Sequence, residues 1–215
     1  QSQPKVLTLR DALDEYLTFQ EDVIVRRTRY DLTNKSTLPQ NELVKLVQEN
    51  VKHAPSAFNS QSTRVLILCG ERHKQFWEIA KHELQEIIPP EKFAPTQEKL
   101  AAFAAAHGTI LFFEDWSVVE SLQAQYPAYK DNFPLWAYQA NAMAEFTVWT
   151  ALAEKGMGAS LQHYNPLVDL EVHRQFHVPL DWKLIAQMPF GVPVSKQAPE
   201  KTFVPIEDRV HVACP

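Results

Sequence analysis

The chain has 215 residues, of which 45% are hydrophobic and 22% are charged, and its formal net charge is −5. These totals describe an ordinary globular protein that is long enough to bury a sizeable core. The negative charge argues against general binding to polyanions, so we expect no nucleic-acid partner, although a local basic patch could still hold one phosphate.

The cysteines and the apolar runs indicate the compartment. Cys69 lies in a run that predicts a buried strand and Cys214 lies at the chain end, so two free thiols in a reducing compartment are the simpler interpretation. No apolar run approaches the roughly 20 residues of a membrane span, and the N-terminus lacks a basic-then-apolar signal. We therefore expect a soluble, cytoplasmic protein with no membrane partner; a removed leader stays open as the alternative.

The first third of the chain predicts two helices and a strand. Thr8 can cap a first helix, whose apolar face would contain Leu9, Ala12, Leu13, Tyr16 and Leu17. A second helix would open at Ser36 or Thr37, with Pro39 at an early helical position. Its apolar side would contain Leu43, Val44, Leu46, Val47 and Val51. Residues 64–69 predict a strand.

The middle of the chain predicts two further helices and a second buried strand. A helix over 72–87 should end before Pro89-Pro90, because the residue before a proline disfavours the helical conformation. Another helix should start with Thr96 as its cap and stop before Gly108. The run "TILFF" at 109–113 predicts the strand.

The longest helical pattern covers residues 134–155. A helix that is apolar nearly all the way round is buried on several sides, so this one must be central in the domain or must meet a second subunit. Its apolar residues are Leu135, Trp136, Ala140, Met143, Phe146, Val148, Trp149 and Leu152.

The last quarter of the chain predicts two strands, one helix and a tail. The strands are 158–162 and 182–191, and Asn165-Pro166 should start a helix by cap and first-turn proline. The proline-dotted residues 192–215 predict an extended C-terminal arm over a surface. We find no internal repeat and no clean boundary, so we expect a single domain over 1–215. Helices flanking a few strands indicate an α+β sandwich.

Several familiar motifs are missing, and one weak metal pattern is present. The sequence contains no G-x-x-x-x-G-K-[ST], no complete G-x-G-x-x-G, and no nucleophile motif around Cys69 or any serine. His173 and His177 lie four apart on a predicted helix, which is a metal-ligand spacing. No carboxylate or cysteine clearly completes such a site, so a solvated histidine pair is favoured and no metal is expected.

Three other stretches have both a functional and an ordinary interpretation. The three arginines of "RRTR" (26–29) form either a solvated basic face or an anion site, since arginine binds phosphate oxygens bidentately. Asn59 and Gln61 belong either to a plain loop or to one that reads the edge of a heterocycle through amide donors and acceptors. Gly156 and Gly158 either cap a helix or let backbone approach a flat ligand closely.

These three stretches, in this order, resemble the FMN-dependent nitroreductase family. "RRTRYDL" is similar to the arginine-rich opening of the family, "APSAFNSQS" to its PS-x-x-N-x-Q loop, and "ALAEKGMGASLQHYNP" to its A-x-x-x-G-x-G helix end and following strand. "GTILFFED" and "YKDNFPLWAYQANAMAEFTVWTAL" look most like the subgroup of the fatty-acid-repression-mutant protein and the copper-induced nitroreductases. The resemblance covers roughly residues 10–210.

The resemblance implies a nitroreductase-like α+β sandwich, with a central, mostly antiparallel sheet flanked by helices, in an intertwined homodimer with two FMN sites at the subunit interface. It implies an NADH- or NADPH-dependent flavin oxidoreductase that passes electrons through flavin N5 to nitroaromatic, quinone or related acceptors by a ping-pong mechanism. The cofactor carries this chemistry and the protein binds and tunes it. The alternative is a flavin-binding stress-response or regulatory protein whose turnover is incidental.

The resemblance also implies the cofactor-binding residues, in four groups along the chain. The first would meet the phosphate and the pyrimidine side of the flavin, the second would line the ring or ribityl chain, the third would lie near the ring, and the fourth would meet the phosphate from the tail. In the same order, the four groups are Arg26, Arg27 and Thr28; Pro55, Ser56, Ala57, Asn59 and Gln61; Leu161, Gln162 and His163; and Lys201.

The sequence departs from the wider family in two places. Phe203 stands where many members carry a second basic residue, so Lys196 or Arg209 could take part in phosphate binding in place of it. Gln162-His163-Tyr164 replaces the commoner run and suggests a pocket specific to the subgroup. The candidate walls of a substrate pocket are Phe113, Phe133 and Trp136, with core packing as the favoured alternative for at least two of them.

Overall fold

A computed structural model describes residues 19–214 of the chain. The helix predicted after Thr8 lies mostly outside the described residues; residues 19–25 are helical. None of the helices in the described part is long and apolar enough to cross a membrane.

A four-stranded sheet forms the centre of the molecule. Its strands are β1 (Thr63–Cys69), β2 (Gly108–Asp115), β3 (Gly158–Ala159) and β4 (Trp182–Gly191), in the order β1-β2-β4-β3. All three pairings are antiparallel, and β1 pairs with β2 along its whole length, from Thr63 opposite Glu114 to Cys69 opposite Gly108. The prediction of an α+β fold around a mostly antiparallel sheet is confirmed.

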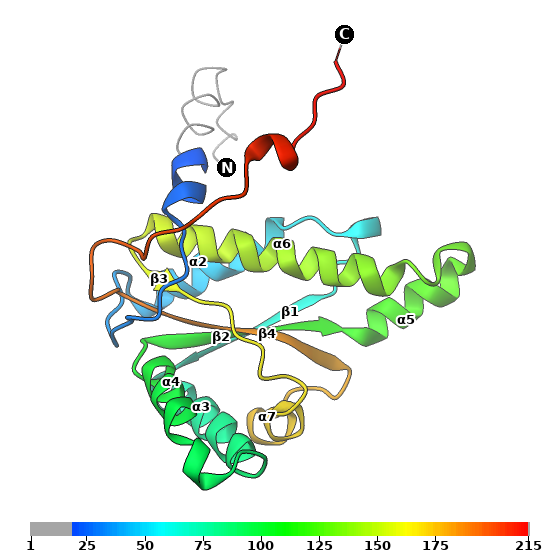
Figure 1. The fold of residues 1–215 in the computed structure, drawn as a ribbon. Helices are drawn as coiled ribbons and strands as arrows, with labels where there is room; N and C mark the ends of the chain where they lie inside the picture. Colours follow the sequence, from blue (N-terminus) through cyan, green and yellow to red (C-terminus); the bar gives the residue numbers. More distant parts are fainter. Residues whose placement is uncertain (1–18, 215) are drawn as a thin grey trace, which may run out of the picture.

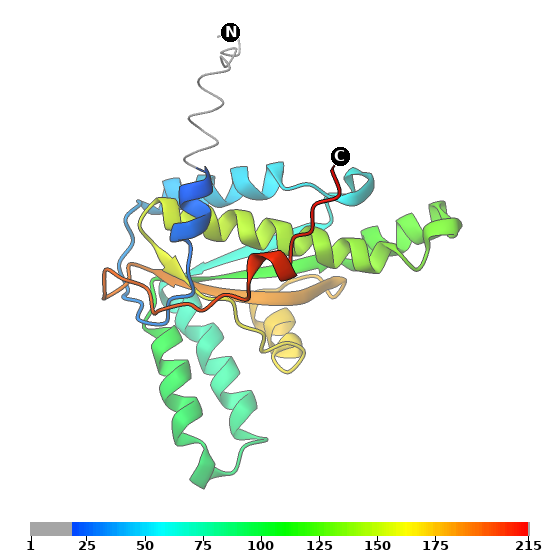
Figure 2. The same ribbon diagram turned by 45° about the horizontal axis from the view of Figure 1, so that its top comes forward.

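Helices cover both faces of the sheet (Figure 1). On one face lie α2 (Gln40–His53) and α6 (Phe133–Glu154); on the other lie α3 (Gly70–Gln85), α4 (Ala94–Ala104) and α7 (Asp169–Phe176). The short α5 (Trp116–Gln125) and the start of α6 project together past the end of the sheet, which both Figure 1 and Figure 2 show.

Strand β2 is buried on both faces, which explains why "TILFF" is a continuous apolar run rather than an alternating one. Ile110 and Phe112 belong to the core cluster under α2 and α6, whereas Leu111 and Phe113 belong to the cluster under α3 and α7. All four side chains are 0% exposed. The sequence pattern therefore reflects a strand enclosed by two helical layers.

Several predicted boundaries need correction. The second helix begins at Gln40 rather than at Ser36 or Thr37, because the Ser36 hydroxyl bonds to the backbone of Leu38 and holds a turn. Helix α4 begins at Ala94, two residues before the predicted cap Thr96. Helix α7 begins at Asp169, so Asn165-Pro166 is not its start. The predicted strand 158–162 is regular only over Gly158–Ala159, and Gln162 adds an isolated bridge to Gln187.

The C-terminus of α6 ends in a Schellman motif centred on Gly156. The Met157 N–H bonds to the Leu152 carbonyl at 2.9 Å and the Gly156 N–H bonds to the Ala153 carbonyl at 2.9 Å. Met157 and Leu152 also meet in the core cluster below, which is the apolar contact that accompanies this motif. Gly156 has φ +77°, so this glycine is the helix cap that one of the two interpretations predicted.

Replacing Gly156 tests this capping role. Gly156→Ala should lower the free energy of unfolding by about 1 kcal/mol, because an L-residue resists positive φ. A Cβ at this position would have only Thr37 Cγ2 nearby, at 3.7 Å, so the loss comes from the backbone and not from a clash. Gly156→Asn should lose less, since asparagine tolerates this conformation. Urea unfolding of the three proteins measures both differences; equal losses would contradict the explanation.

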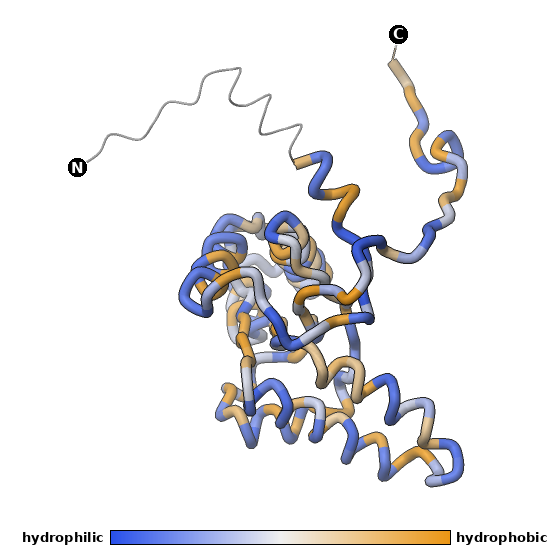
Figure 3. Tube along the Cα trace, turned by 90° about the vertical axis from the view of Figure 1, so that its left-hand side faces the viewer, coloured by the Kyte–Doolittle hydropathy of each residue, from blue (hydrophilic) through white to orange (hydrophobic). Residues whose placement is uncertain are grey.

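The chain leaves the sandwich after β4. Leu32 bridges to Pro193 and the Asp31 carbonyl accepts from the Val194 N–H at 2.7 Å, so the start of the tail is anchored. Beyond residue 198 the chain runs away from the sheet and carries apolar positions that no part of the described chain covers (Figure 3). The most exposed of these are Phe203, Ile206 and Val212, at 74%, 64% and 80%.

Candidate functional site

The arginine-rich stretch lies against the glycine-containing strand β3. Thr28 forms a parallel bridge with Ala159, and the Arg29 N–H bonds to the Ala159 carbonyl at 2.9 Å. A Cβ on Gly158 would come within 2.8 Å of Arg29 Cγ. Gly158 therefore leaves room for the Arg29 side chain, and the interpretation that the glycine pair lets the backbone approach a flat ligand stays a prediction.

Arg26 presents a half-buried cation that forms no ion pair within residues 19–214. Its guanidinium lies over the rings of Trp149 and Phe146 of α6, at 4.5 and 5.8 Å from their centroids. Its Nε is buried and has no hydrogen-bond partner among the described residues. Burial, and secondarily the charge of Arg27, lower the pKa of the Arg26 guanidinium. A buried donor of this kind indicates a missing acceptor.

Arg27 lines a hollow beside the glycine turn. The hollow, about 270 Å³, is bounded by Gly156, Gly158, Val194 and Lys196 as well as by Arg27 and Arg29. Arg27 also donates to the Pro199 carbonyl in the tail. Of the three tail residues considered for phosphate binding, Lys196 is the one that lines this hollow; Lys201 instead lies over the ring of Phe203 at 5.1 Å.

The third arginine of the stretch has a structural role that the sequence motif did not reveal. Arg29 is 7% exposed and makes a bidentate pair with Asp31, at 3.0 and 2.9 Å. Both side chains also bond to Ser195, which ties the start of the tail to this stretch. The hydrogen bond from Arg29 is the main reason why the pKa of Asp31 lies far below its ordinary value. The spacing Arg29-x-Asp31 was the sequence signal from which this ion pair could have been predicted.

The polar loop of residues 54–62 is closed by Ser56. The Asn59 N–H bonds to the Ser56 carbonyl at 3.0 Å, and the Gln61 N–H bonds to the Ser56 hydroxyl at 3.0 Å. Phe58, Asn59 and Gln61 all have positive φ, between 49° and 57°. Non-glycine residues in this region store strain and cluster at functional sites. Pro55, Ser56 and Gln61 line a small cavity of about 200 Å³ with Thr63 and with Ala140 of α6.

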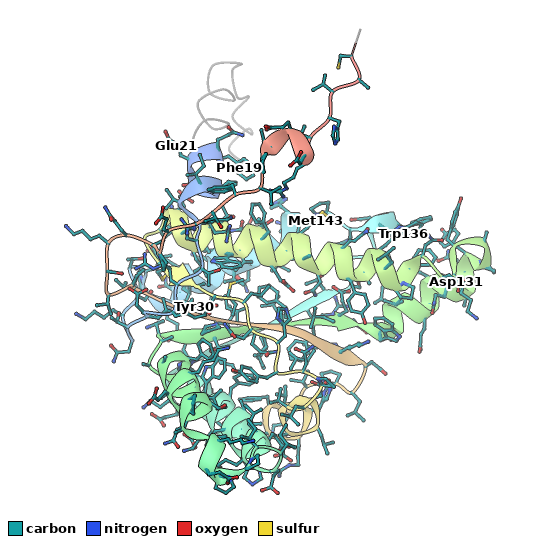
Figure 4. All side chains as sticks on the ribbon, viewed as in Figure 1. Phe19, Glu21, Tyr30, Asp131, Trp136 and Met143 are labelled. Atoms are coloured by element: carbon teal, nitrogen blue, oxygen red, sulfur yellow. The ribbon has the colours of Figure 1, made fainter. Side chains whose placement is uncertain are left out.

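Phe58 attaches this loop to an aromatic cluster at the projecting end of α5 and α6. Its ring is 49% exposed and lies 4.9 Å from Tyr126, 5.3 Å from Phe133 and 6.0 Å from Trp136. Trp136 lies at the projecting end of the molecule in Figure 4 and packs partly buried against this cluster.

Two of the three predicted pocket walls are core residues. Phe113 is fully buried between the sheet and the layer of α3 and α7, so the prediction that it lines a substrate pocket is wrong. Phe133 is 2% exposed and packs with Val119 and Ala137. Trp136 is the one that remains accessible. This result agrees with the interpretation that at least two of the three residues pack in the core.

The segment after β3 continues alongside β4. Leu161 packs partly buried on the core under α6, and Gln162 is 8% exposed and exchanges backbone hydrogen bonds with Gln187. The Gln162 amide donates to the Ser160 hydroxyl at 3.1 Å. His163 points outside the core and is exposed. The backbone of this segment is fixed by the sheet, while its side chains differ in their access to a ligand.

The arginine stretch and the polar loop meet different parts of α6. Arg26 contacts Trp149, and the cavity of the loop is bounded by Ala140, so about nine residues or roughly 13 Å of helix separate them. The hollow beside Arg27 contains none of the loop residues. Met143 lies between the two levels and faces away from the sheet (Figure 4). Met143 is 40% exposed and Phe146 is 38% exposed, so the helix leaves an apolar face open between the arginine stretch and the polar loop.

The histidine pair of α7 forms no metal centre in the described part of the chain. His173 Nδ1 lies 3.2 Å from the Val178 carbonyl, and His177 ends the helix with φ 54°. The described residues contain no group of three or more metal-ligating side chains. Both cysteines are free. Cys69 is only half-buried, because it stands at the end of the edge strand β1 and not within a covered strand.

Comparison with known proteins places the chain in a family. The model of the nitroreductase family matches residues 23–192. The nitroreductase FRM2 of Saccharomyces cerevisiae is 33% identical over 183 residues, which are 83% of this chain and 89% of FRM2. The chain belongs to the nitroreductase family, as the three ordered motifs predicted.

Solved structures extend this result to the fold. The nitroreductase CinD of Lactococcus lactis, in complex with chloramphenicol, is 43% identical with a TM-score of 0.83, over 91% of this chain and 99% of CinD. A nitroreductase of Desulfitobacterium hafniense with bound FMN shares the fold at 18% identity and a TM-score of 0.65, over 91% of this chain and 98% of that one. The protein is an oxidoreductase of the nitroreductase type.

Proposed function

We propose that the protein is an FMN-dependent oxidoreductase that takes electrons from NADH or NADPH and passes them to nitroaromatic, quinone or related acceptors in a ping-pong cycle. The observation that carries the proposal is the buried, unpartnered Nε of Arg26 in a chain of the nitroreductase family. An anionic or carbonyl-rich ligand supplies the acceptor that this N–H lacks. FMN, when bound, supplies the hydride-accepting N5 atom.

The residues around Arg26 fit such a ligand. Arg27 and Lys196 share one hollow, so their charges are suited to the phosphate, with the Thr28 hydroxyl and Lys201 assisting. Arg26 stands on two aromatic faces, where it would lie beside the pyrimidine edge of the flavin and favour the reduced, anionic ring. The segment Leu161–His163 would approach the ring. Pro55, Ser56, Ala57, Asn59 and Gln61 would complete the site.

The loop would complete the site of a second subunit. If two copies pack α6 against α6 in opposite directions with Met143 near the two-fold axis, Ala140 of one copy lies opposite Phe146 of the partner subunit. Ala140 marks the level of the loop and Phe146 that of Arg26. We call the arginine stretch and the polar loop the two half-sites. A two-fold interface brings the arginine half-site of one copy next to the loop half-site of the other. The exposed apolar face of α6 and the apolar positions of the tail support the homodimer, in which the arm 192–215 would cover the partner.

The acceptor would be a flat, apolar molecule. Phe58 and Trp136 are accessible aromatic rings beside the polar loop, and aromatic faces favour stacking with such molecules. CinD has been solved with chloramphenicol and with 4-nitrophenol, which supports an aromatic acceptor for a relative with this degree of identity. We propose a single domain acting in the cytoplasm.

A visible absorption spectrum tests the proposal directly. The purified protein should carry, or take up on addition of FMN, one flavin per subunit, and NADH or NADPH should bleach it in the absence of oxygen. Adding a quinone should then restore the oxidised spectrum. A protein that stays colourless after FMN is added contradicts the proposal. If NADH or NADPH bleaches the flavin but no added acceptor reoxidises it faster than oxygen does, a stress-response or regulatory flavoprotein is favoured.

A further inference from the structure

Two acidic side chains are buried near each other, and one of them bonds to the end of the polar loop. Glu114, near the end of β2, is 0% exposed, and Glu145 on α6 is 7% exposed. The ion pairs formed among residues 19–214 include neither of them. Burying two carboxyl groups without a cation is unfavourable unless hydrogen bonds or a proton neutralise them.

The Glu114 carboxyl accepts three hydrogen bonds from neighbouring side chains. Its Oε2 accepts from the Ser62 hydroxyl at 2.5 Å, and its Oε1 accepts from the Thr63 hydroxyl at 2.6 Å and from the Asn141 amide at 2.9 Å. Three donated hydrogen bonds stabilise the charged form of a carboxyl group. Ser62 ends the polar loop and Thr63 begins β1, so these bonds also fix the point where the loop leaves the sheet.

Glu145 has the environment of a protonated carboxyl. No described hydrogen bond donor reaches it, and its burial, followed by the charge of Glu114, raises its pKa to about 7. Asn141 lies one turn earlier on the same helix, and its Oδ1 is buried without a partner. A neutral Glu145 carries an O–H that can satisfy this orphan acceptor. The amide of Asn141 would then connect the two acids.

Within residues 19–214 no cation on the neighbouring elements forms an ion pair with Glu145. Arg26 lies over the rings of Phe146 and Trp149. Arg64 of β1 is paired with Asp115 of β2 at 2.9 Å. Lys52 at the end of α2 lines the cavity of the loop and is exposed. On α6 itself the other acidic residue is Glu154, which pairs with Lys155 at the far end.

We propose that Glu145 is a positioning residue: by holding a proton it keeps Glu114 bonded to Ser62 and Thr63, and so fixes the 54–62 loop in the shape that the site needs. Ionisation of Glu145 puts a second negative charge beside Glu114 and removes the donor to Asn141. The loop then loses its anchor. Only the link from the loop to a cofactor rests on the proposed function.

The sign of the pH dependence follows from the raised pKa. An unfolded chain releases the Glu145 proton near the ordinary value of 4.5, whereas the folded protein keeps it until about pH 7. The contribution to stability is therefore complete below about pH 4.5, falls as the pH rises toward 7, and is lost above it. Glu145→Gln cannot ionise, so this part of the pH dependence should disappear in that variant.

Amide hydrogen exchange of the loop tests the proposal in the full-length protein without added flavin. Exchange of the segment 54–62 is measured at pH 6 and pH 8 and corrected for the intrinsic effect of pH. Protection in the unmodified protein should fall about ten-fold at pH 8, because one pH unit above the pKa leaves roughly a tenth of the carboxyl neutral. Glu145→Gln should show no fall. Glu154→Gln, an exposed change on the same helix, should behave like the unmodified protein.

Two results would overturn the proposal. One is equal loss of protection in the unmodified protein and in Glu145→Gln; the other is a loop whose protection does not change with pH in either. If Glu145→Gln does not fold, carbon-13 NMR of the glutamate carboxyls in the unmodified protein decides: a carboxyl titrating near pH 7 supports the proposal, and titration of all of them below pH 5 refutes it. If the protein binds no FMN, the proposed function is refuted, but the exchange and NMR measurements still test the role of Glu145.

Discussion

Replacing Arg26 by alanine is expected to weaken FMN binding by about 2 kcal/mol, or roughly thirty-fold in Kd. The guanidinium lies over Trp149 and Phe146, and its buried Nε has no partner within residues 19–214, so we expect it to donate to a ligand that accepts hydrogen bonds. Its removal leaves an anionic ligand without a charge-assisted partner. Quenching of flavin fluorescence, titrated against the apoprotein, measures the change in Kd.

Two further variants separate a lost contact from a general effect of charge. Arg26→Lys keeps the charge but lacks the planar fork, so it should recover only part of the affinity. Arg174→Ala removes an exposed arginine on α7 that pairs with Glu171, and should leave FMN binding unchanged. Unchanged affinity in Arg26→Ala would assign the phosphate and the ring edge to other residues, with Arg27 and Lys196 the next to test.

The sequence predicted best those elements that have a long, uninterrupted pattern of apolar residues. Strand β4 has the predicted bounds, and α6 lies within one residue of them, since a continuous apolar run and a long helical period are strong local signals. Helix α5 was missed. It begins directly after β2, whose last residue Asp115 is its N-cap but makes no side-chain capping bond. Its short run "WSVVESLQAQ" is followed by no glycine stop.

The starts of α2, α4 and α7 were misplaced because side-chain caps were assumed where the chain uses other means. Their N-caps are Pro39, Phe93 and Val168, and none makes a side-chain capping bond. Hydroxyl residues near these starts have other roles, as Ser36 shows by holding a turn. Propensity rules place a cap at the nearest suitable residue, but tertiary contacts decide where the helix begins.

The candidate site was visible in the sequence as motifs, but its geometry was not. The glycine pair illustrates this, since Gly156 caps a helix whereas Gly158 lies against the Arg29 side chain, a contact that neither interpretation predicted. The proximity of Glu114 to Glu145 involves residues 31 positions apart, and no local pattern reveals it. Burial of Phe113 depended on the second helical layer, which the apolar run alone could not place.

Mixing two variants that each bind FMN weakly should restore tight flavin binding to some of the sites, and this result tests the shared site. Asn59→Ala removes an amide of the polar loop without touching the core, so this variant should fold but bind FMN weakly. Arg26→Ala damages the other half-site. In a mixed dimer one site would carry both changes and the other neither. Random mixing makes half of the dimers mixed, so about a quarter of all sites should regain full affinity.

The fraction recovered distinguishes the arrangements because each predicts a different value. If Arg26 and Asn59 of one chain served the same site, every site in the mixture would keep one change, and no site of full affinity would appear. The two proteins are unfolded together, refolded and titrated with FMN, with each variant refolded alone as the control. A mixture of Arg26→Ala with Arg27→Ala should recover nothing, since both arginines belong to the same half-site beside β3 and the start of the tail. Recovery in that second mixture would mean that Arg26 and Arg27 of one chain serve two different sites.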